Sequence, residues 1–157
     1  MSKSLVAYFS ATGITAKVAE RLAEATGSDL FEIKPVQPYT EKDLDWTDTT
    51  SRTTIEMKDK PDTRPEIAEK VKNMDSYDTI YIGFPIWWYT CPKIINTFLE
   101  SYDLTGKKVV PFATSGTSGY GNTNESIKAS TNANVTEGTR FAANISPDQL
   151  KNWADNI

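Results

Sequence analysis

The order of apolar runs and amphipathic segments constrains this sequence more than any other feature. Runs rich in strand formers alternate with segments that carry apolar residues at helical spacing. We expect strands at 5–9, 30–33, 77–84, 107–113 and 135–141, and helices at 15–24, from Pro65 to about 74, and at 92–100, 126–130 and 147–156. The stretch 37–62 is expected to be irregular. This alternation predicts an α/β fold: a doubly wound, five-stranded parallel sheet of order 2-1-3-4-5 in a three-layer α/β/α arrangement.

Length and composition are those of one globular unit. The chain has 157 residues, of which 38% are hydrophobic and 24% charged, and it contains neither repeats nor a linker-like segment. We therefore expect a single domain over 1–157.

The absence of histidine and the presence of only one cysteine restrict the kinds of catalytic and metal site that the side chains could form. With His 0 and Cys 1, the sequence excludes Ser-His-Asp and Cys-His sites, disulfide frameworks, CxxC pairs and cysteine-ligated clusters. Redox or acid–base chemistry would therefore have to come largely from a cofactor.

The charge and hydropathy of the sequence argue against nucleic-acid and membrane partners. The formal net charge of −4 has the wrong sign for binding nucleic acid or anionic lipid, and no window approaches the length of apolar sequence that spans a bilayer. The start of the chain does not resemble a secretory signal. We expect a cytoplasmic protein with no nucleic-acid or membrane partner.

Ligands of doubly wound sheets bind beyond the carboxyl ends of the strands where the winding reverses. In this sequence that rule selects the loops after Phe9, Phe84 and Ala113.

The loop after Phe9 reads Ser10-Ala11-Thr12-Gly13-Ile14-Thr15 and leads into a helix. Its hydroxyls, its glycine and the free N–H groups of a helix N-terminus suit a phosphate monoester, with helix capping as the alternative. The patterns of a P-loop and of a GxGxxG dinucleotide site are missing.

The loop after Phe84 contains consecutive aromatic residues. It reads Pro85-Ile86-Trp87-Trp88-Tyr89-Thr90-Cys91-Pro92. Neighbouring side chains point in different directions, so not all three aromatic side chains can face the core. An exposed ring would stack on a planar heterocycle, whereas the alternative is an aromatic corner that packs on the adjacent helix.

The loop after Ala113 is rich in glycine and small hydroxyl residues. It reads Thr114-Ser115-Gly116-Thr117-Ser118-Gly119-Tyr120-Gly121-Asn122. Such a backbone can approach a ligand closely and offer hydrogen bonds to its polar edge, although a plain flexible loop is the alternative.

Together these three motifs resemble the flavodoxin-like FMN-binding proteins, more narrowly the short-chain bacterial flavodoxin family. The resemblance covers nearly the whole chain and implies FMN as cofactor. It implies that the phosphate is held by Ser10, Thr12, Gly13, Ile14 and Thr15. The ribityl chain and ring would be wrapped by Pro85, Ile86, Trp87, Trp88 and Tyr89, with either tryptophan as the stacking residue. The polar edge of the ring would be bordered by Thr114, Ser115, Gly116, Ser118, Gly119 and Tyr120.

The resemblance implies a redox flavoprotein. It would either carry electrons to and from a redox partner protein or act as an oxidoreductase that passes them from NAD(P)H to a small acceptor, and no side chain is assigned a catalytic role. Dedicated carriers of this kind are typically far more acidic, and only the stretch 41–48 offers a docking surface for a basic partner.

Two alternative functions belong to other classes of protein. A receiver-type signalling module is disfavoured because the third expected strand ends Gly83-Phe84-Pro85 instead of at an aspartate. The other alternative, a non-redox binding or regulatory protein with the same fold, is not excluded by the sequence.

We assign no metal site, because Asp29, Asp43, Asp45 and Asp48 lack EF-hand spacing, and we take Cys91 as a structural thiol.

Overall fold

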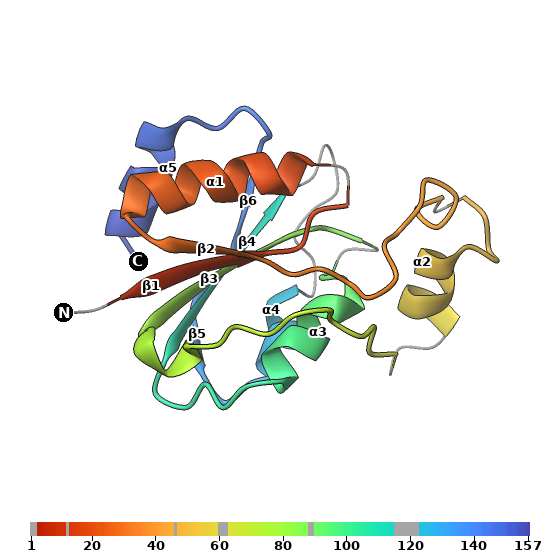
Figure 1. Ribbon diagram of the computed structural model, residues 1–157. Coiled ribbons are helices and arrows are strands. Elements are labelled where there is room, and N and C mark those ends of the chain that lie inside the picture. Colours follow the sequence, from red (N-terminus) through yellow and green to blue (C-terminus); the bar gives the residue numbers. More distant parts are fainter. Residues whose placement is uncertain (1–2, 12, 46, 60–62, 88–89, 115–122) are drawn as a thin grey trace.

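The computed structural model describes residues 3–11, 13–45, 47–59, 63–87, 90–114 and 123–157. Its strands are β1 (Ser4–Tyr8), β2 (Asp29–Glu32), β3 (Thr79–Pro85), β4 (Lys108–Thr114), β5 (Asn134–Val135) and β6 (Thr139–Phe141). They form a parallel sheet of order β2-β1-β3-β4-β5, with β6 also paired to β4. The predicted doubly wound order is confirmed (Figure 1).

The fifth position of the sheet differs from the single strand expected at 135–141. β5 pairs with the start of β4, and β6 pairs with its end. The break between them includes Gly138, which has no side chain to pack on the sheet and therefore weakens strand pairing there.

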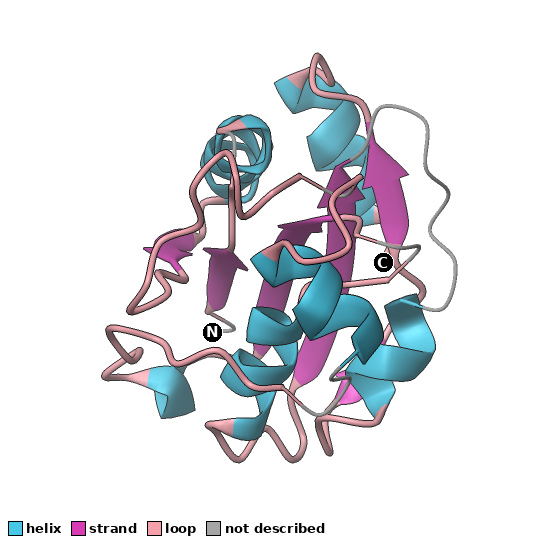
Figure 2. Ribbon diagram, turned by 90° about the vertical axis from the view of Figure 1, so that its right-hand side faces the viewer, coloured by secondary structure: helices cyan, strands magenta, loops and turns pink. Residues whose placement is uncertain are grey.

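Helices cover both faces of the sheet, as expected. Helices α1 (Ile14–Thr26) and α5 (Pro147–Asp155) lie on one face, and α3 (Lys93–Glu100) and α4 (Thr123–Lys128) lie on the other (Figures 1 and 2). Alternate residues of β1 enter different cores: Val6 packs with Val18 and Leu22 of α1, while Leu5 joins the cluster that contains Ile94 and Phe98 of α3. Burial on both faces accounts for the near-continuous apolar sequence of the central strands.

The helix expected from Pro65 is wrong. Across 63–73, all of which the structure describes, no helix forms; Met74 begins a short 3-10 helix (Met74–Ser76). The backbone there pairs with the chain after β2: Val36 N–H donates to Glu66 O, and Ala68 N–H donates to Lys34 O. Those long-range bonds use the groups that a helix would have needed.

The stretch expected to be irregular contains a helical turn. Helix α2 (Arg52–Thr54) continues into a π-helix (Ile55–Asp59), and the Ser51 hydroxyl caps it by accepting from Thr54 N–H at 3.4 Å. In Figure 1 this segment lies beyond the end of the sheet to which β1 and β3 run.

Gly83 lies within β3, in agreement with the strand expected at 77–84. It stands opposite Phe112 of β4. A Cβ atom at Gly83 would lie 2.9 Å from Phe112 Cε1 and closer still to Cε2 and Cζ. The glycine is therefore required because the phenylalanine ring covers this position of the neighbouring strand.

No helix in the described parts of the chain is long and apolar enough to cross a membrane.

Candidate functional site

The starts of the three loops chosen from the sequence meet at one end of the sheet. Phe9 N–H donates to Gly83 O at 2.9 Å, which joins the ends of β1 and β3. Ile86 N–H donates to Thr114 O at 3.2 Å, which joins the ends of β3 and β4. The expected convergence at the point where the winding reverses is thus present in the backbone.

The first loop leads into α1 through a left-handed glycine. Gly13 is the N-cap of α1 with φ 91°, and its N–H donates to Ser10 Oγ at 3.0 Å. This bond differs from a conventional cap, in which the hydroxyl accepts from the second or third residue of the helix. A Cβ at Gly13 would meet no atom of the described residues within 4 Å, so that part of the chain leaves space beside the helix start.

The N-terminus of α1 offers donors for an anion. The first intrahelical bond of the turn runs from Lys17 N–H to Gly13 O, so the N–H groups of Ile14, Thr15 and Ala16 have no partner within the helix. The first turn carries no acidic residue that would compete for them. The helix has 13 residues, so its dipole is fully developed and favours negative charge at this end.

Ile14 departs from the helical pattern read from the sequence. Val18 and Leu22 are fully buried, whereas Ile14 is 45% exposed. A large exposed apolar side chain beside N–H groups that have no partner within the helix matches a ligand with both an anionic and an apolar part.

Thr15 and Thr114 are bonded to each other. Their hydroxyls lie 2.7 Å apart, and the two residues are 2% and 4% exposed. This buried bond ties the start of α1 to the end of β4. Both were expected to contact the cofactor, and the bond holds the first and third loops in fixed relation.

Trp87 is half-buried in an aromatic group. Its ring makes T-shaped contacts with Phe9 at 5.6 Å and with Tyr39 at 5.3 Å between centroids. Two backbone hydrogen bonds join Trp87 and Thr90, at 3.0 and 3.1 Å. Of the neighbouring predicted residues, Pro85 ends β3 and Ile86 is 9% exposed.

Half of the predicted site lies outside the described residues. These are Thr12, Trp88, Tyr89, Ser115, Gly116, Ser118, Gly119 and Tyr120. The assignment of these residues to the cofactor, like that of the described ones, stays a prediction.

Sequence reasoning missed Tyr39, which the fold places beside Trp87, and also Arg52 and Glu56, which both contact Tyr39. The Arg52 guanidinium lies 3.8 Å from the centroid of the Tyr39 ring and pairs with Glu56 at 2.9 Å. Burial, and then the hydrogen bond to Glu56, raise the pKa of the Tyr39 hydroxyl above its usual range. The Arg52–Glu56 spacing of four was a visible signal of a helical ion pair, but nothing in the sequence linked it to Trp87.

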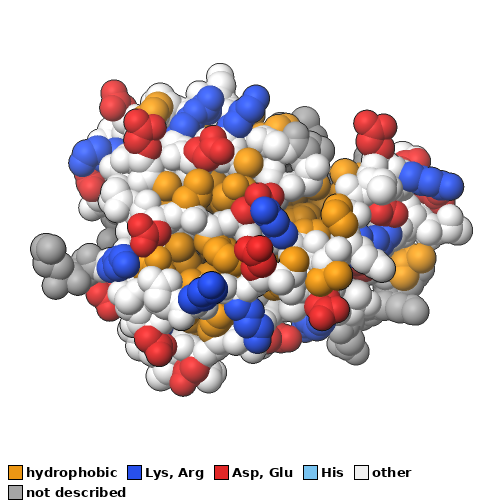
Figure 3. All heavy atoms as spheres, viewed as in Figure 1, with side chains coloured by type: hydrophobic (Ala, Val, Ile, Leu, Met, Phe, Trp, Pro, Cys, Tyr) orange, Lys and Arg blue, Asp and Glu red, His pale blue; other side chains and the backbone are white. Residues whose placement is uncertain are grey.

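The acidic stretch makes local turns. Asp43 Oδ2 accepts from Thr40 N–H, Asp45 Oδ1 from Thr47 and Asp48 Oδ1 from Thr50. No group of three potential metal ligands occurs among the described residues. On the face in Figure 3, cationic and anionic side chains are interspersed around an apolar band, so this face does not carry a field of one sign.

Cys91 precedes α3 and is fully buried. Its thiol lies 3.6 Å from Ser126 Oγ and 3.8 Å from Asn96 Oδ1. Burial raises the pKa of the Cys91 thiol, and this effect outweighs the hydrogen bond from the thiol to Ser126, which lowers it.

Comparison with known proteins gives consistent results. The family model described as Flavodoxin matches residues 3–157. A protein from Bacteroides eggerthii, described as a flavoprotein, has a crystal structure that is 48% identical, with a TM-score of 0.92 over 100% of this chain and 98% of that one.

A more distant structure contains a ligand. It is a flavoprotein from Lactobacillus acidophilus in complex with FMN, 25% identical, with a TM-score of 0.73 over 98% of this chain and 99% of that one. A flavodoxin from the domain Archaea, 16% identical, shares the fold with a TM-score of 0.59 over 99% of this chain and 95% of that one. No curated protein matches the chain.

Proposed function

Because this chain belongs to the flavodoxin family, we propose that it binds FMN and works as a redox flavoprotein. It either carries electrons between protein partners or passes them from NAD(P)H to a small acceptor. The bound flavin supplies the electron chemistry. The protein residues bind, orient and shield it.

One observation carries the proposal: the N–H groups at the start of α1 that have no partner within the helix, the Trp87 ring and Thr114 come from loops that hydrogen bonds hold together. Phe9 N–H bonded to Gly83 O, and the Thr15–Thr114 hydroxyl pair, fix these loops relative to one another. The donor set consists of N–H groups and neutral hydroxyls, which suits a phosphate monoester at a helix N-terminus. The exposed Ile14 and the half-buried Trp87 add apolar surface for the rest of such a ligand.

The phosphate assignment is tested by comparing two ligands that differ only in the phosphate. Titration of the protein with FMN and with riboflavin, followed by quenching of flavin fluorescence, gives both affinities. Ser10→Ala combined with Thr12→Ala should weaken FMN binding and leave riboflavin binding nearly unchanged. Equal loss for both ligands would show that this loop does not hold the phosphate.

A matched control is available on α5. Ser146 is the N-cap of that helix, and its hydroxyl accepts from Gln149 N–H at 3.2 Å. Ser146→Ala removes a hydroxyl from a helix start away from the site and should cost about 1 kcal/mol of stability. It should not change FMN affinity.

The choice between carrier and reductase depends on the electron donor. Anaerobic addition of NADH or NADPH to the FMN-loaded protein should bleach the visible flavin bands if nicotinamide reduces it directly. A protein that stays oxidised until a reductase is added would be a carrier. Failure of the purified protein to bind FMN would remove the proposal and favour a non-redox binding protein.

A further inference from the structure

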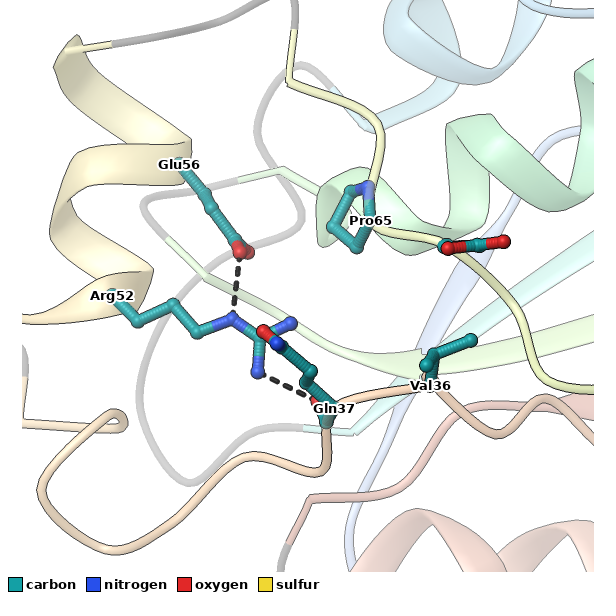
Figure 4. A pocket seen from close by; sticks show the side chains of 6 residues that line it. Val36, Gln37, Arg52, Glu56 and Pro65 are labelled. Atoms are coloured by element: carbon teal, nitrogen blue, oxygen red, sulfur yellow. Dashed lines mark hydrogen bonds and ion pairs between the residues drawn. The ribbon is translucent and has the colours of Figure 1, made fainter.

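A buried ion pair lies next to the aromatic part of the site. Glu56 is 7% exposed, and both of its carboxylate oxygens have partners: Oε2 accepts from Arg52 Nε at 2.9 Å and Oε1 from the Tyr39 hydroxyl at 2.5 Å. Arg52 also donates from Nη1 to the backbone oxygen of Gln37 at 2.7 Å (Figure 4). We call Tyr39, Arg52 and Glu56 the Tyr39 cluster.

The Tyr39 cluster fixes the ring of Tyr39 in two ways. Its hydroxyl is held by Glu56, and its face is covered by the Arg52 guanidinium at 3.8 Å. A guanidinium on an aromatic face is stronger where water is excluded, and the bond to Glu56 Oε2 orients its plane. The two constraints are coupled, because the same carboxylate binds both partners.

The Tyr39 ring in turn contacts the predicted flavin-binding segment. Trp87 packs against it at 5.3 Å with an interplanar angle of 72°. Phe9, at the end of β1, contacts both rings at 5.6 Å. A continuous set of contacts therefore runs from α2 to Trp87.

Arg52 has room to leave this position. A cavity of about 340 Å³ lies beside it, lined also by Val36, Gln37, Pro65 and Glu66 (Figure 4). Neutralising Glu56 would remove the ion pair that helps to keep the guanidinium on the ring, and would leave the bond from Nη1 to the backbone oxygen of Gln37.

We propose that Arg52 and Glu56 are positioning residues, which act through Tyr39 to hold Trp87 in the orientation that FMN binding needs. The role in binding rests on the proposed function. The effect on Trp87 does not, because it is a property of the protein alone.

The test uses ¹⁹F NMR of the full chain labelled with 5-fluorotryptophan, without FMN, together with FMN titration. Trp87→Phe assigns the resonance. In Glu56→Gln and Arg52→Lys, the Trp87 resonance should shift or broaden, and FMN affinity should fall by roughly tenfold, or about 1.4 kcal/mol. Arg52→Lys is informative because lysine keeps the charge but lacks the planar group that stacks on Tyr39.

The control is the other ion pair of spacing four, Lys151–Asp155 of α5, which is exposed. Asp155→Asn should change neither the Trp87 resonance nor FMN affinity. If Glu56→Gln does not fold, Tyr39→Phe tests the proposal in its place, since it keeps the ring and removes only the bond to Glu56. This variant should shift the Trp87 resonance and lower the affinity for FMN.

Two results would overturn the proposal: an unchanged Trp87 resonance in the folded variants, or a changed resonance with FMN affinity equal to that of the wild type. If the wild-type protein itself does not bind FMN, the proposed function fails. The resonance then still shows whether the Tyr39 cluster orients Trp87.

Discussion

Gly83→Ala should destabilise the protein strongly, although it adds one methyl group to a strand. The added Cβ would lie 2.9 Å from Phe112 Cε1 and closer to two other ring atoms, whereas carbon atoms in contact are separated by about 3.5–4.0 Å. The ring would have to move by about 1 Å or more. Phe112 is fully buried and packs against Phe141 at 6.1 Å between centroids, so the movement would disturb the core behind it.

We expect a cost of about 3 kcal/mol, the upper end of the usual range for overpacking. For a chain of 157 residues that cost corresponds to a fall in Tm of roughly 6–12 °C. Urea unfolding followed by circular dichroism measures the free energy, and thermal unfolding gives the Tm.

A double-mutant cycle identifies the cause. Phe112→Leu will itself cost stability by leaving a cavity, but in that background Gly83→Ala should cost less than about 1 kcal/mol. Gly27→Ala is the matched control: Gly27 has φ 66° and nothing within 4 Å of its Cβ, so its cost is backbone strain and should be the same with either residue at 112. The reasoning would be refuted if Gly83→Ala stayed within about 0.5 kcal/mol of wild type, or if it cost the same in both backgrounds.

Three further outcomes follow from buried groups. Thr15→Val and Thr114→Val should each cost about 1–3 kcal/mol in thermal unfolding, because each leaves the other hydroxyl buried without its partner, and the double variant should cost less than their sum; additive costs would contradict the pairing. Cys91 should react with DTNB only after denaturation at pH 8, because burial raises its pKa and blocks access; fast release of thionitrobenzoate from the native protein would contradict this. The folded-state pKa of Tyr39 is raised above its unfolded value of 10.0, so its contribution to stability is fully present below pH 10 and is lost as pH rises above it. Tyr39→Phe should therefore reduce the fall in unfolding free energy between about pH 10 and 11.5, and an unchanged slope would argue against the shift.

The sequence was sufficient for the order of the sheet and for selecting three loops whose first residues meet at one end of it. Continuous apolar runs such as the one from Ile80 to Phe84 are typical of strands buried on both faces, and the rule for parallel sheets then selects three loops. Helix α3 was also predicted to within a residue, because its apolar positions follow one face and a proline precedes it.

Elements that depend on long-range pairing were not predicted. The apolar spacing of Ile67, Val71 and Met74 suits a helix, yet the backbone of this segment is hydrogen-bonded to the chain at Lys34 and Val36. The last strand was expected to be continuous over 135–141, but β5 pairs with the start of β4 and β6 with its end, and a run of strand formers does not show where on a neighbouring strand each part will pair.

Local chemistry is therefore what the sequence by itself determined: which runs form strands, which loop offers hydroxyls before a helix, and that redox or acid–base chemistry must come largely from a cofactor. Only the tertiary structure decided which side chains meet. The hydroxyls of Thr15 and Thr114 are separated by 99 positions but bond at 2.7 Å, and Arg52 reaches Trp87 only through Tyr39. The physical reason is that side-chain contacts between distant segments depend on how the helices and loops pack on the sheet, and packing is a property of the whole chain.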